Sequence, residues 1–409
     1  MPGYGARYWS DRTAENRRRA HSKFRGKHTA DVVVIGGGLT GCAAAYGLAS
    51  AGLDVVLLEA DRLAAGATAG SLGAVLPQPD AVFADVDKAA GRKVARLAWK
   101  EAHRGAREFV SVLKKLPTRC DLVASSLFIN AASSADAVLL RREQGLRKDA
   151  GLDAPWLAAP VARRELGTDT GGAIHLQDAY EFDPVRAALG LAGAAESAGA
   201  RIFERSRVTR TRFTRKDALV VLEHGALQAR GVVVATGEPG ALFGQLRRHV
   251  RRLEGFAVAT HSLSAAMRRE VGMRKGVMTE AGLSPHWLRW LADDRILFAG
   301  ALSRPTAERQ RETAIVGRTA QLMYELSVRY PAISGLPAAW GWSLPVVSTP
   351  DGLPWIGPHR NYPHHFFAIA LGWHGDGLTW LAAKAAVRHF RHESRPEDEA
   401  FGFARQLSR

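Results

Sequence analysis

A cluster of glycines directly after an apolar run limits how this chain can fold more than any other feature. Residues 32–35 read Val-Val-Val-Ile, and residues 36–41 read Gly-Gly-Gly-Leu-Thr-Gly, which is a G-x-G-x-x-G pattern. An unbroken apolar run is typical of a parallel strand that is covered on both faces. The pattern therefore predicts a strand over residues 31–35, a tight turn, and a helix from about residue 39 to residue 51.

An acidic residue at the end of the next apolar run completes a nucleotide-binding β-α-β unit. Residues 54–59 predict a second strand that ends at Glu59. We expect Gly36 to allow the turn, Gly38 to admit a pyrophosphate close to the backbone, and Gly41 to let the helix lie close to the strand. Glu59 is expected to accept hydrogen bonds from ribose hydroxyls, and its charge disfavours the phosphate of NADP. The unit predicts dinucleotide binding; the alternative is a glycine-rich turn without a ligand.

Three further segments favour FAD over NAD as the dinucleotide. Residues 66–73 form a loop of small residues, and residues 232–237 end an apolar run in Ala-Thr-Gly. Residues 372–379 are glycine-rich and open a predicted helix that runs to about residue 390. The N-terminus of such a helix stabilises the negative charge that develops on a flavin during reduction.

Several motifs along the chain carry a resemblance to a known family. They are Tyr8-Trp9, Ala30–Gly41, Phe182-Asp183-Pro184, Ala235-Thr236-Gly237, His286–Trp290 followed by Leu297–Gly300, Thr349–Gly357, and the glycine-rich run before the last helix. In this order the chain resembles the D-amino-acid oxidase superfamily of FAD-dependent oxidoreductases, which includes glycine and sarcosine oxidases. It is most similar to the gamma-glutamylputrescine-oxidase-like branch.

The resemblance implies an α/β fold, in which a Rossmann-type FAD-binding domain carries a discontinuous α+β substrate domain built on an antiparallel sheet. It also implies oxidation of the C–N bond of a small amine or amino acid by hydride transfer to flavin N5, which gives an imine that water hydrolyses. The expected division is a basic N-terminal arm at 1–29, an FAD-binding domain at 30–85, 161–244 and 340–395, a substrate domain at 86–160 and 245–339, and a C-terminal tail at 396–409.

The same patterns and the resemblance assign the expected site residues. The cofactor-binding residues are Gly36, Gly37, Gly38, Thr40, Gly41, Glu59, Ala60, Thr68, Ser71, Val208, Thr236, Gly237, Gly372, Gly375, Gly377 and Leu378. The candidate catalytic or substrate-binding residues are His286, Arg289, Trp342 and His374. In a strand over 286–290, alternate residues face opposite sides, and the sequence leaves open which set faces the flavin. Arg289 is a candidate clamp for a substrate carboxylate or a surface arginine, His374 a base or a packed histidine, and Trp342 a pocket wall or core filler.

Two departures from the family pattern concern the flavin. The segment that matches the flavin attachment site of sarcosine oxidase reads Trp340-Gly341-Trp342, without cysteine or histidine, so we expect noncovalent FAD. The strand expected over residues 295–300 lacks the lysine that assists reaction with oxygen in sarcosine-oxidase-like members. An oxidase and a dehydrogenase that uses another electron acceptor therefore both stay open.

The charge and the cysteine content limit the partners and the compartment. The formal net charge is +16 and only two cysteines occur, Cys42 and Cys120, without a metal-type spacing. No apolar run is long enough to span a membrane, and we expect the protein in a reducing cytoplasm.

The positive charge motivates an alternative function, an FAD-dependent enzyme that trims an aminomethyl group on tRNA. The basic residues form no tract interleaved with aromatic residues, so we do not expect nucleic acid as a partner. A flavoprotein that oxidises no amine is the third reading.

Overall fold

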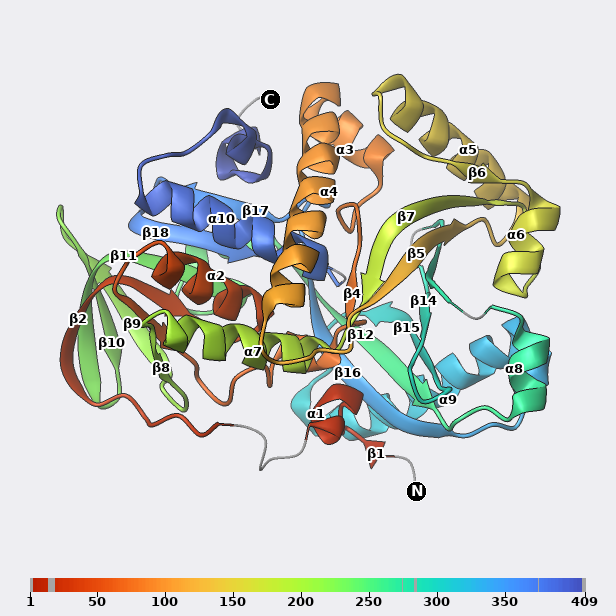
Figure 1. Cartoon of the computed structure of the whole chain (residues 1–409), viewed down its shortest axis with the longest axis horizontal. Helices are drawn as coiled ribbons and strands as arrows, with labels where there is room; N and C mark the ends of the chain where they lie inside the picture. The colour runs from red at the N-terminus through yellow and green to blue at the C-terminus, as the bar shows by residue number, and fades with distance from the viewer. Residues whose placement is uncertain (1–2, 14–18, 274, 283–284, 374, 407–409) are drawn as a thin grey trace.

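A computed structural model shows two β-sheets that lie side by side, with helices on their outer faces (Figure 1). The structure describes residues 3–13, 19–273, 275–282, 285–373 and 375–406. Within these residues the larger sheet has ten strands and the smaller sheet has eight. This arrangement confirms the expected α/β fold with a second unit built on a mainly antiparallel sheet.

The smaller sheet is parallel at its centre and carries the predicted β-α-β unit. Its strands are β2 (Gly26–Ile35), β3 (Val55–Leu58), β8 (Arg201–Phe203), β9 (Val208–Phe213), β10 (Ala218–Leu222), β11 (Gly225–Gly237), β17 (Trp355–His359) and β18 (Tyr362–Ile369). The order is β17-β18-β11-β2-β3-β8, and β9 and β10 add an antiparallel extension to β11. Residues Ile35, Val234 and Phe367 lie side by side in β2, β11 and β18. The carboxyl ends of these strands therefore meet at one edge of the sheet.

The larger sheet faces this edge. Its strands are β1 (Gly3–Tyr4), β4 (Ala74–Val75), β5 (Val123–Asn130), β6 (Trp156–Leu157), β7 (Ala173–Glu181), β12 (Arg251–Thr260), β13 (Val277–Glu280), β14 (Trp287–Trp290), β15 (Ile296–Ser303) and β16 (Ala338–Ser348). Most neighbours are antiparallel, whereas β1 and β16, and β5 and β13, are parallel.

The helices follow the sequence signals closely. They are α1 (Tyr8–Arg12), α2 (Leu39–Ser50), α3 (Phe83–Ala90), α4 (Arg92–Lys115), α5 (Ser134–Asp149), α6 (Ala159–Leu166), α7 (Pro184–Ser197), α8 (Ala265–Val271), α9 (Arg311–Arg329) and α10 (Thr379–Phe390). In α7, Asp183 caps the N-terminus by accepting hydrogen bonds from the N–H groups of Val185 and Arg186, both at 3.0 Å. Helices α2, α7 and α10 lie together beside the smaller sheet (Figure 1).

The two sheets do not divide the chain at the boundaries expected from the sequence. Strand β7 and all but the first two residues of β16 lie inside the ranges 161–244 and 340–395, which we assigned to the FAD-binding domain, but both strands belong to the larger sheet. They do so because β7 pairs with β5 and β16 pairs with β12, far away in sequence. These two ranges therefore contribute to both sheets.

The first residues of the basic N-terminal segment pack against the rest of the protein. Strand β1 pairs with β16, and Tyr8 and Trp9 of α1 are only 1% and 4% exposed. Trp9 donates its indole N–H to the carbonyl oxygen of Ser71 at 2.9 Å. Tyr8 and Trp9 therefore belong to the core, because burial of their apolar surface outweighs the surrounding charge.

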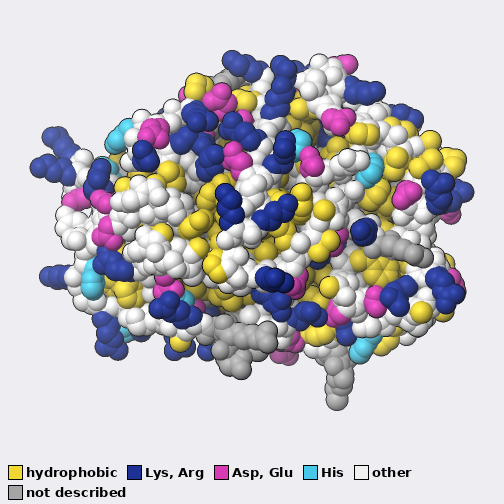
Figure 2. All heavy atoms as spheres, viewed as in Figure 1, with side chains coloured by type: hydrophobic (Ala, Val, Ile, Leu, Met, Phe, Trp, Pro, Cys, Tyr) yellow, Lys and Arg dark blue, Asp and Glu magenta, His cyan; other side chains and the backbone are white. Residues whose placement is uncertain are grey.

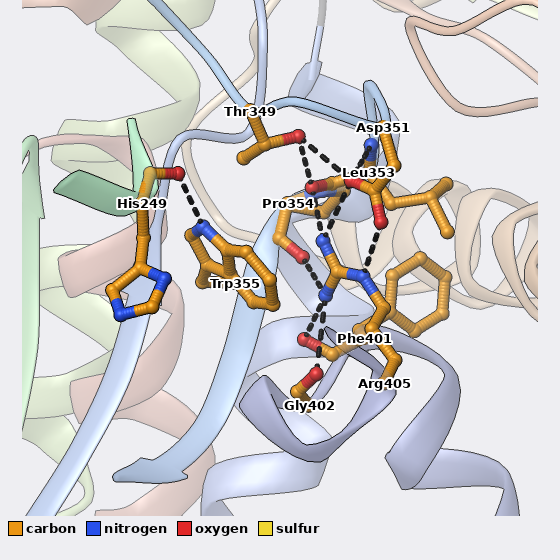
Figure 3. A network of polar contacts seen from close by, with 9 residues as sticks. All are labelled: His249, Thr349, Asp351, Leu353, Pro354, Trp355, Phe401, Gly402 and Arg405. Atoms are coloured by element: carbon orange, nitrogen blue, oxygen red, sulfur yellow. Dashed lines mark hydrogen bonds and ion pairs between the residues drawn. The ribbon is translucent and has the colours of Figure 1, made fainter. Parts of the chain in front are cut away.

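The C-terminal segment is fastened by one buried arginine (Figure 3). Arg405 lies in the short 3-10 helix η8 (Phe403–Gln406), 3.6 Å above the ring of Trp355. Its Nε and Nη2 donate to the two carboxylate oxygens of Asp351, at 2.7 Å and 3.1 Å. It also donates to the carbonyl oxygens of Leu353 and Pro354 at 2.6 Å and 2.8 Å. This segment thus holds the loop between β16 and β17 in place.

Charges of both signs are mixed on the face of the molecule shown in Figure 2. On the face shown in Figure 2, Lys and Arg side chains are scattered and interspersed with acidic ones. Among the helices of the described residues, none combines the length and the apolar character that crossing a membrane requires.

Candidate FAD and substrate site

The carboxyl edge of the smaller sheet combines buried strands with accessible ends. The residues of β2 and β3 that lead to the edge are buried, whereas Gly36, Gly38 and Glu59 just beyond them are half-buried. Thr236 and Gly237, at the end of β11, are exposed. An open α/β sheet binds its ligand in this position, at the carboxyl ends of strands whose connections run to opposite sides.

The glycine turn after β2 leaves no room for side chains. Gly36 has a φ of +107°, and a Cβ atom there would lie 2.6 Å from the carbonyl oxygen of Ala235. A Cβ atom on Gly41 would lie 1.8 Å from the carbonyl oxygen of Gly36. A Cβ atom on Gly37 would lie 2.9 Å from the Cβ atom of Glu59. The turn can therefore exist only with glycine, and its backbone is open to a ligand.

The N-terminus of α2 lies directly behind this turn. Gly38 occupies the N-cap position and brings no side chain to the free amides. The N–H of Leu39 donates to the hydroxyl of Thr68 at 2.9 Å, which places Thr68 beside the helix end. Thr40 is half-buried in the first turn of the helix. Free amides and the helix dipole favour an anion at this point.

Glu59 closes the turn from the end of β3. Its Oε2 accepts a hydrogen bond from the N–H of Gly37 at 2.6 Å, and its Oε1 accepts one from the N–H of Asp61 at 2.8 Å. Its own carbonyl oxygen accepts from the N–H of Ser206 at 2.7 Å. Val208, two residues further on, is buried in the same apolar cluster as Ile35 and Leu58. Ala60 is half-buried beside Glu59.

A second glycine-rich loop reaches this edge from the end of β18. Gly372 has a φ of +90°, and the N–H of Trp373 donates to the carboxylate of Asp80 at 2.7 Å. The short helix η6 (Gly375–Leu378) then leads into α10. A Cβ atom on Gly377 would lie 2.6 Å from the carbonyl oxygen of Leu76, so this loop lies directly against the loop that follows residue 66.

Ser71 and Asp376 join these two loops. The Ser71 hydroxyl donates to Oδ2 of Asp376 at 3.1 Å. Burial raises the pKa of Asp376 to about 7, although hydrogen bonds from the Ser71 hydroxyl and from the N–H groups of Ala74 and Gly73, together with the charge of Arg289, act in the opposite direction. The residue nevertheless keeps some exposed surface. The sequence alone gave no reason to assign Asp376 a role. Its pKa is raised by burial under segments that are far away in sequence.

Arg289 fits neither of the two roles considered for it. It is 5% exposed, so it is no surface arginine. Its Nη1 donates to the carbonyl oxygens of Leu72 at 2.9 Å and Phe182 at 3.2 Å, and also to that of Gly73. Its Nε donates to the carbonyl oxygen of Trp290 at 3.3 Å and lies 3.4 Å from the carboxylate of Glu181. Nη1 and Nε therefore already donate hydrogen bonds within the protein. Bidentate binding of a substrate carboxylate needs two free nitrogens of the guanidinium group, so Arg289 cannot provide it.

His286 lies on the other face of the larger sheet. Its ring stacks on Phe298, with 4.9 Å between ring centroids, and contacts the carboxylates of Glu280 at 2.7 Å and Glu325 at 3.0 Å. Trp287 and Arg289 face the smaller sheet instead. The candidate role of His286 is therefore wrong: alternation along β14 sends its side chain away from the site.

Of the two other candidates, only Trp342 can be placed. It is 1% exposed, and its indole N–H donates to the carbonyl oxygen of Gly70 at 3.2 Å, so it walls the loop beside Ser71. His374 lies outside the described residues. Trp373 and Trp9, to which sequence reasoning gave no role, also line this region: a Cβ atom on Gly255 of β12 would lie 2.7 Å from the Trp373 ring.

Together these features fit FAD. A glycine turn, in which a Cβ atom on Gly36 or Gly41 would meet the backbone, lies before the N-terminus of α2, whose N-cap residue brings no side chain. A carboxylate at the end of β3 suits ribose hydroxyls. The glycine-rich loop after β18 lies at the same edge and suits the far end of an extended dinucleotide.

Comparison with known proteins identifies the family. A family model described as FAD dependent oxidoreductase (DAO) matches residues 31–389. Gamma-glutamylputrescine oxidoreductase of Escherichia coli (strain K12) is 24% identical over 374 residues, which cover 90% of this chain and 84% of that protein. The crystal structure of glycine oxidase from Geobacillus kaustophilus matches with a TM-score of 0.75 at 21% identity and covers 92% of this chain and 98% of that one. L-alpha-glycerophosphate oxidase from Mycoplasma pneumoniae, solved with FAD bound, has a TM-score of 0.71 at 15% identity, over 89% of this chain and 95% of that one.

The match to the family model covers far more than half of the chain. It includes the glycine turn, Glu59 and the glycine-rich loop before α10, and the solved glycine oxidase structure shares the fold. The chain therefore belongs to the FAD dependent oxidoreductase family, and its cofactor is FAD.

Proposed function

We propose that this protein oxidises the C–N bond of a small amine or amino acid by hydride transfer to flavin N5, which gives an imine that water hydrolyses. The observation that carries the proposal is the contact between the FAD edge and the larger sheet. Gly70 and Trp373, from the two loops of that edge, contact Trp342 and Gly255 of the sheet. A substrate held there is enclosed by apolar side chains next to the cofactor. The names of two relatives, gamma-glutamylputrescine oxidoreductase and glycine oxidase, support this class of substrate.

Residues of the glycine turn and of β3 would hold the cofactor. The backbone at Gly36, Gly38 and Gly41 and the first amides of α2 suit the pyrophosphate, and Glu59 suits the ribose. Val208, by its resemblance to the family, would offer backbone contacts to the adenine. When bound, FAD supplies the acceptor for a hydride that leaves the carbon next to nitrogen. Water exclusion at that carbon falls to Trp342 and Trp373, which lie against the two loops.

Asp376 supplies the proton chemistry in this proposal. An amine must be neutral before the carbon next to it can release a hydride, so a nearby group has to take the ammonium proton. A carboxyl group with a pKa near 7 changes its protonation state at neutral pH, whereas an ordinary aspartate would already be ionised. The Ser71 hydroxyl holds Oδ2 of this carboxyl group in place.

An anaerobic screen tests the proposal. Purified enzyme with bound FAD is mixed with a panel of amines and amino acids in the absence of oxygen, and loss of the oxidised flavin absorbance is followed. We expect at least one compound to reduce the flavin. If dithionite reduces the flavin but no compound does, the protein is a flavoprotein that oxidises no amine. Admission of oxygen after reduction then separates an oxidase, which reoxidises rapidly, from a dehydrogenase.

A second arm of the screen concerns the tRNA alternative. In the sequence the basic residues form no tract interleaved with aromatic residues, and on the face shown in Figure 2 they are scattered. We therefore expect tRNA to bind weakly and to lose its binding as salt rises to physiological strength. A stable complex at that salt concentration, together with flavin reduction by modified tRNA alone, would replace the small-molecule proposal.

A further inference from the structure

The guanidinium group of Arg289 joins segments that are far apart in the sequence. From β14 its Nη1 donates to the carbonyl oxygens of Leu72 at 2.9 Å and Phe182 at 3.2 Å, and also to that of Gly73. Its Nε lies 3.4 Å from the carboxylate of Glu181, at the end of β7. One buried side chain thus connects β14 and the end of β7 with the loop that carries Gly73.

This loop passes so close to Arg289 that glycine is needed at the contact. Gly73 has a φ of +71°, a conformation that favours glycine. A Cβ atom there would lie 2.6 Å from the carbonyl oxygen of Phe182 and 2.9 Å from Nη1 of Arg289. The N–H of Phe182 donates to the carbonyl oxygen of Gly73 at 2.9 Å, and the next residue, Ala74, pairs with Glu181. The backbone of residues 73 and 74 is therefore held directly against the guanidinium group.

The same short segment also contacts Asp376. The N–H groups of Gly73 and Ala74 donate hydrogen bonds to the carboxyl group of Asp376. The Ser71 hydroxyl donates to Oδ2 of this group at 3.1 Å. The segment therefore connects the guanidinium group with the carboxyl group to which the proposed function assigns the proton transfer.

The two side chains are also coupled through their charges. Burial lowers the pKa of Arg289, and nearby acidic groups from several elements act in the opposite direction: Glu181, Tyr8, Asp183 and Asp376. Burial raises the pKa of Asp376, and the positive charge of Arg289 acts against that rise. A guanidinium group keeps its charge in proteins, so this charge is present whichever form the carboxyl group takes.

We propose that Arg289 is a positioning residue for Asp376. Its guanidinium group fixes the segment whose N–H groups hold the Asp376 carboxylate, and its charge keeps that carboxylate available to accept a proton from the substrate ammonium group. The proton passes from the nitrogen to a carboxylate oxygen, which leaves a neutral amine and a neutral carboxyl group. The inference rests on the proposed function and deepens it, because it adds a residue that acts through Asp376.

Infrared titration of the FAD-loaded enzyme follows Asp376 directly and needs no substrate. A protonated carboxyl group has a C=O band that a carboxylate lacks, and the band that disappears in Asp376→Asn identifies the residue. Arg289→Met removes both the charge and the hydrogen bonds that hold the segment, and each loss favours the protonated form. We expect the midpoint of the band to move to higher pH by about one unit. An unchanged midpoint, or the absence of any band that depends on Asp376, overturns the inference.

Further variants separate the role of the charge from a general effect on folding. Arg289→Lys keeps a positive charge and should restore at least half of the midpoint shift, whereas a shift as large as that of Arg289→Met overturns the role of the charge. If Arg289→Met does not fold, Arg289→Gln takes its place, because it keeps hydrogen-bond donors without the charge and should shift the midpoint in the same direction.

Arg295→Met is the matched control. Arg295 also donates to a carboxylate and to a backbone carbonyl oxygen, those of Asp293 and Thr260, both at 2.9 Å. The variant should leave the midpoint of the Asp376 band unchanged. A shift equal to that of Arg289→Met would overturn the inference.

The rate of flavin reduction adds a readout that a structural defect does not reproduce. With an Asp376 pKa near 7, a rise by one unit lowers the ionised fraction at pH 7 from about one half to about one tenth. With a substrate from the anaerobic screen, Arg289→Met should therefore reduce its bound flavin about fivefold more slowly than the wild type at pH 7. At about pH 9 the rates should be nearly equal, because the carboxyl group is ionised in both proteins. An equal loss of rate at both pH values would show a purely structural role and overturn the inference.

The two proposals fail separately. Flavin reduction by an amine, together with an unshifted infrared midpoint, would leave the proposed function intact and overturn the inference. An enzyme whose flavin is reduced by no amine or amino acid would overturn the proposed function, whatever the infrared midpoint.

Discussion

The substitution Asp376→Asn tests the electrostatics of the site. The pKa of Asp376 rises from 3.8 to about 7 on folding, so between these values the folded protein binds a proton that the unfolded chain has released. Stability therefore falls as the pH rises through this window, and it is constant above about pH 7. Each tenfold change in proton affinity corresponds to about 1.4 kcal/mol, so the full cost is at most about 4 kcal/mol, and solvent access to the side chain reduces it. Asparagine keeps the shape and cannot ionise.

Urea unfolding of the FAD-free protein at pH 5 and pH 8 measures this effect. From pH 5 to pH 8 the wild type should lose up to about 3 kcal/mol relative to the variant, because most of the window lies between these values. Ser71→Ala is a useful comparison, since it removes the hydroxyl that donates to Asp376 and leaves the titrating group in place. A constant difference between the wild type and Asp376→Asn at both pH values would refute the assignment of a raised pKa to this residue.

Three further predictions follow from the same geometry. Gly36→Ala should abolish most FAD binding, because the new Cβ atom meets the carbonyl oxygen of Ala235 at 2.6 Å and the φ of +107° disfavours alanine; a flavin-to-protein absorbance ratio equal to the wild type's would contradict this. Arg405→Ala should lower the free energy of unfolding by about 3–5 kcal/mol, because it leaves the Asp351 carboxylate buried without its cation. If urea unfolding shows a loss below about 1 kcal/mol, the contacts of Figure 3 contribute little to stability. Acid precipitation should release all of the yellow chromophore into the supernatant, because the segment Trp340–Trp342 offers no cysteine or histidine for a covalent bond, and colour retained in the pellet would show covalent attachment.

Local signals in the sequence were sufficient to predict the nucleotide-binding unit. The glycine spacing, the apolar runs and Glu59 predict β2, α2 and β3, and the Asp183-Pro184 pair predicts the start of α7. These features depend on residues close together in the chain, where periodicity and capping act.

The positions of the candidate substrate-binding residues could not be predicted, because they depend on contacts between segments that are far apart in sequence. Alternation along β14 allowed His286 and Arg289 equally, and only the pairing of β14 with β13 and β15 decides which one faces the smaller sheet. Arg289 is held by carbonyl oxygens of Leu72 and Phe182, more than a hundred residues away in sequence. The burial of Trp9 against Ser71 could not be predicted either, because these two residues are 62 positions apart in the chain.

A crystal structure of the FAD complex is the most direct test of the arrangement described here. The pyrophosphate should lie at residues 36–41 and the ribose at Glu59, and the flavin ring should lie between residues 372–378 and the face of the larger sheet that carries Trp287 and Trp342. A flavin ring bound on the opposite face of that sheet, beside His286, or anywhere away from these tryptophans, would contradict the account.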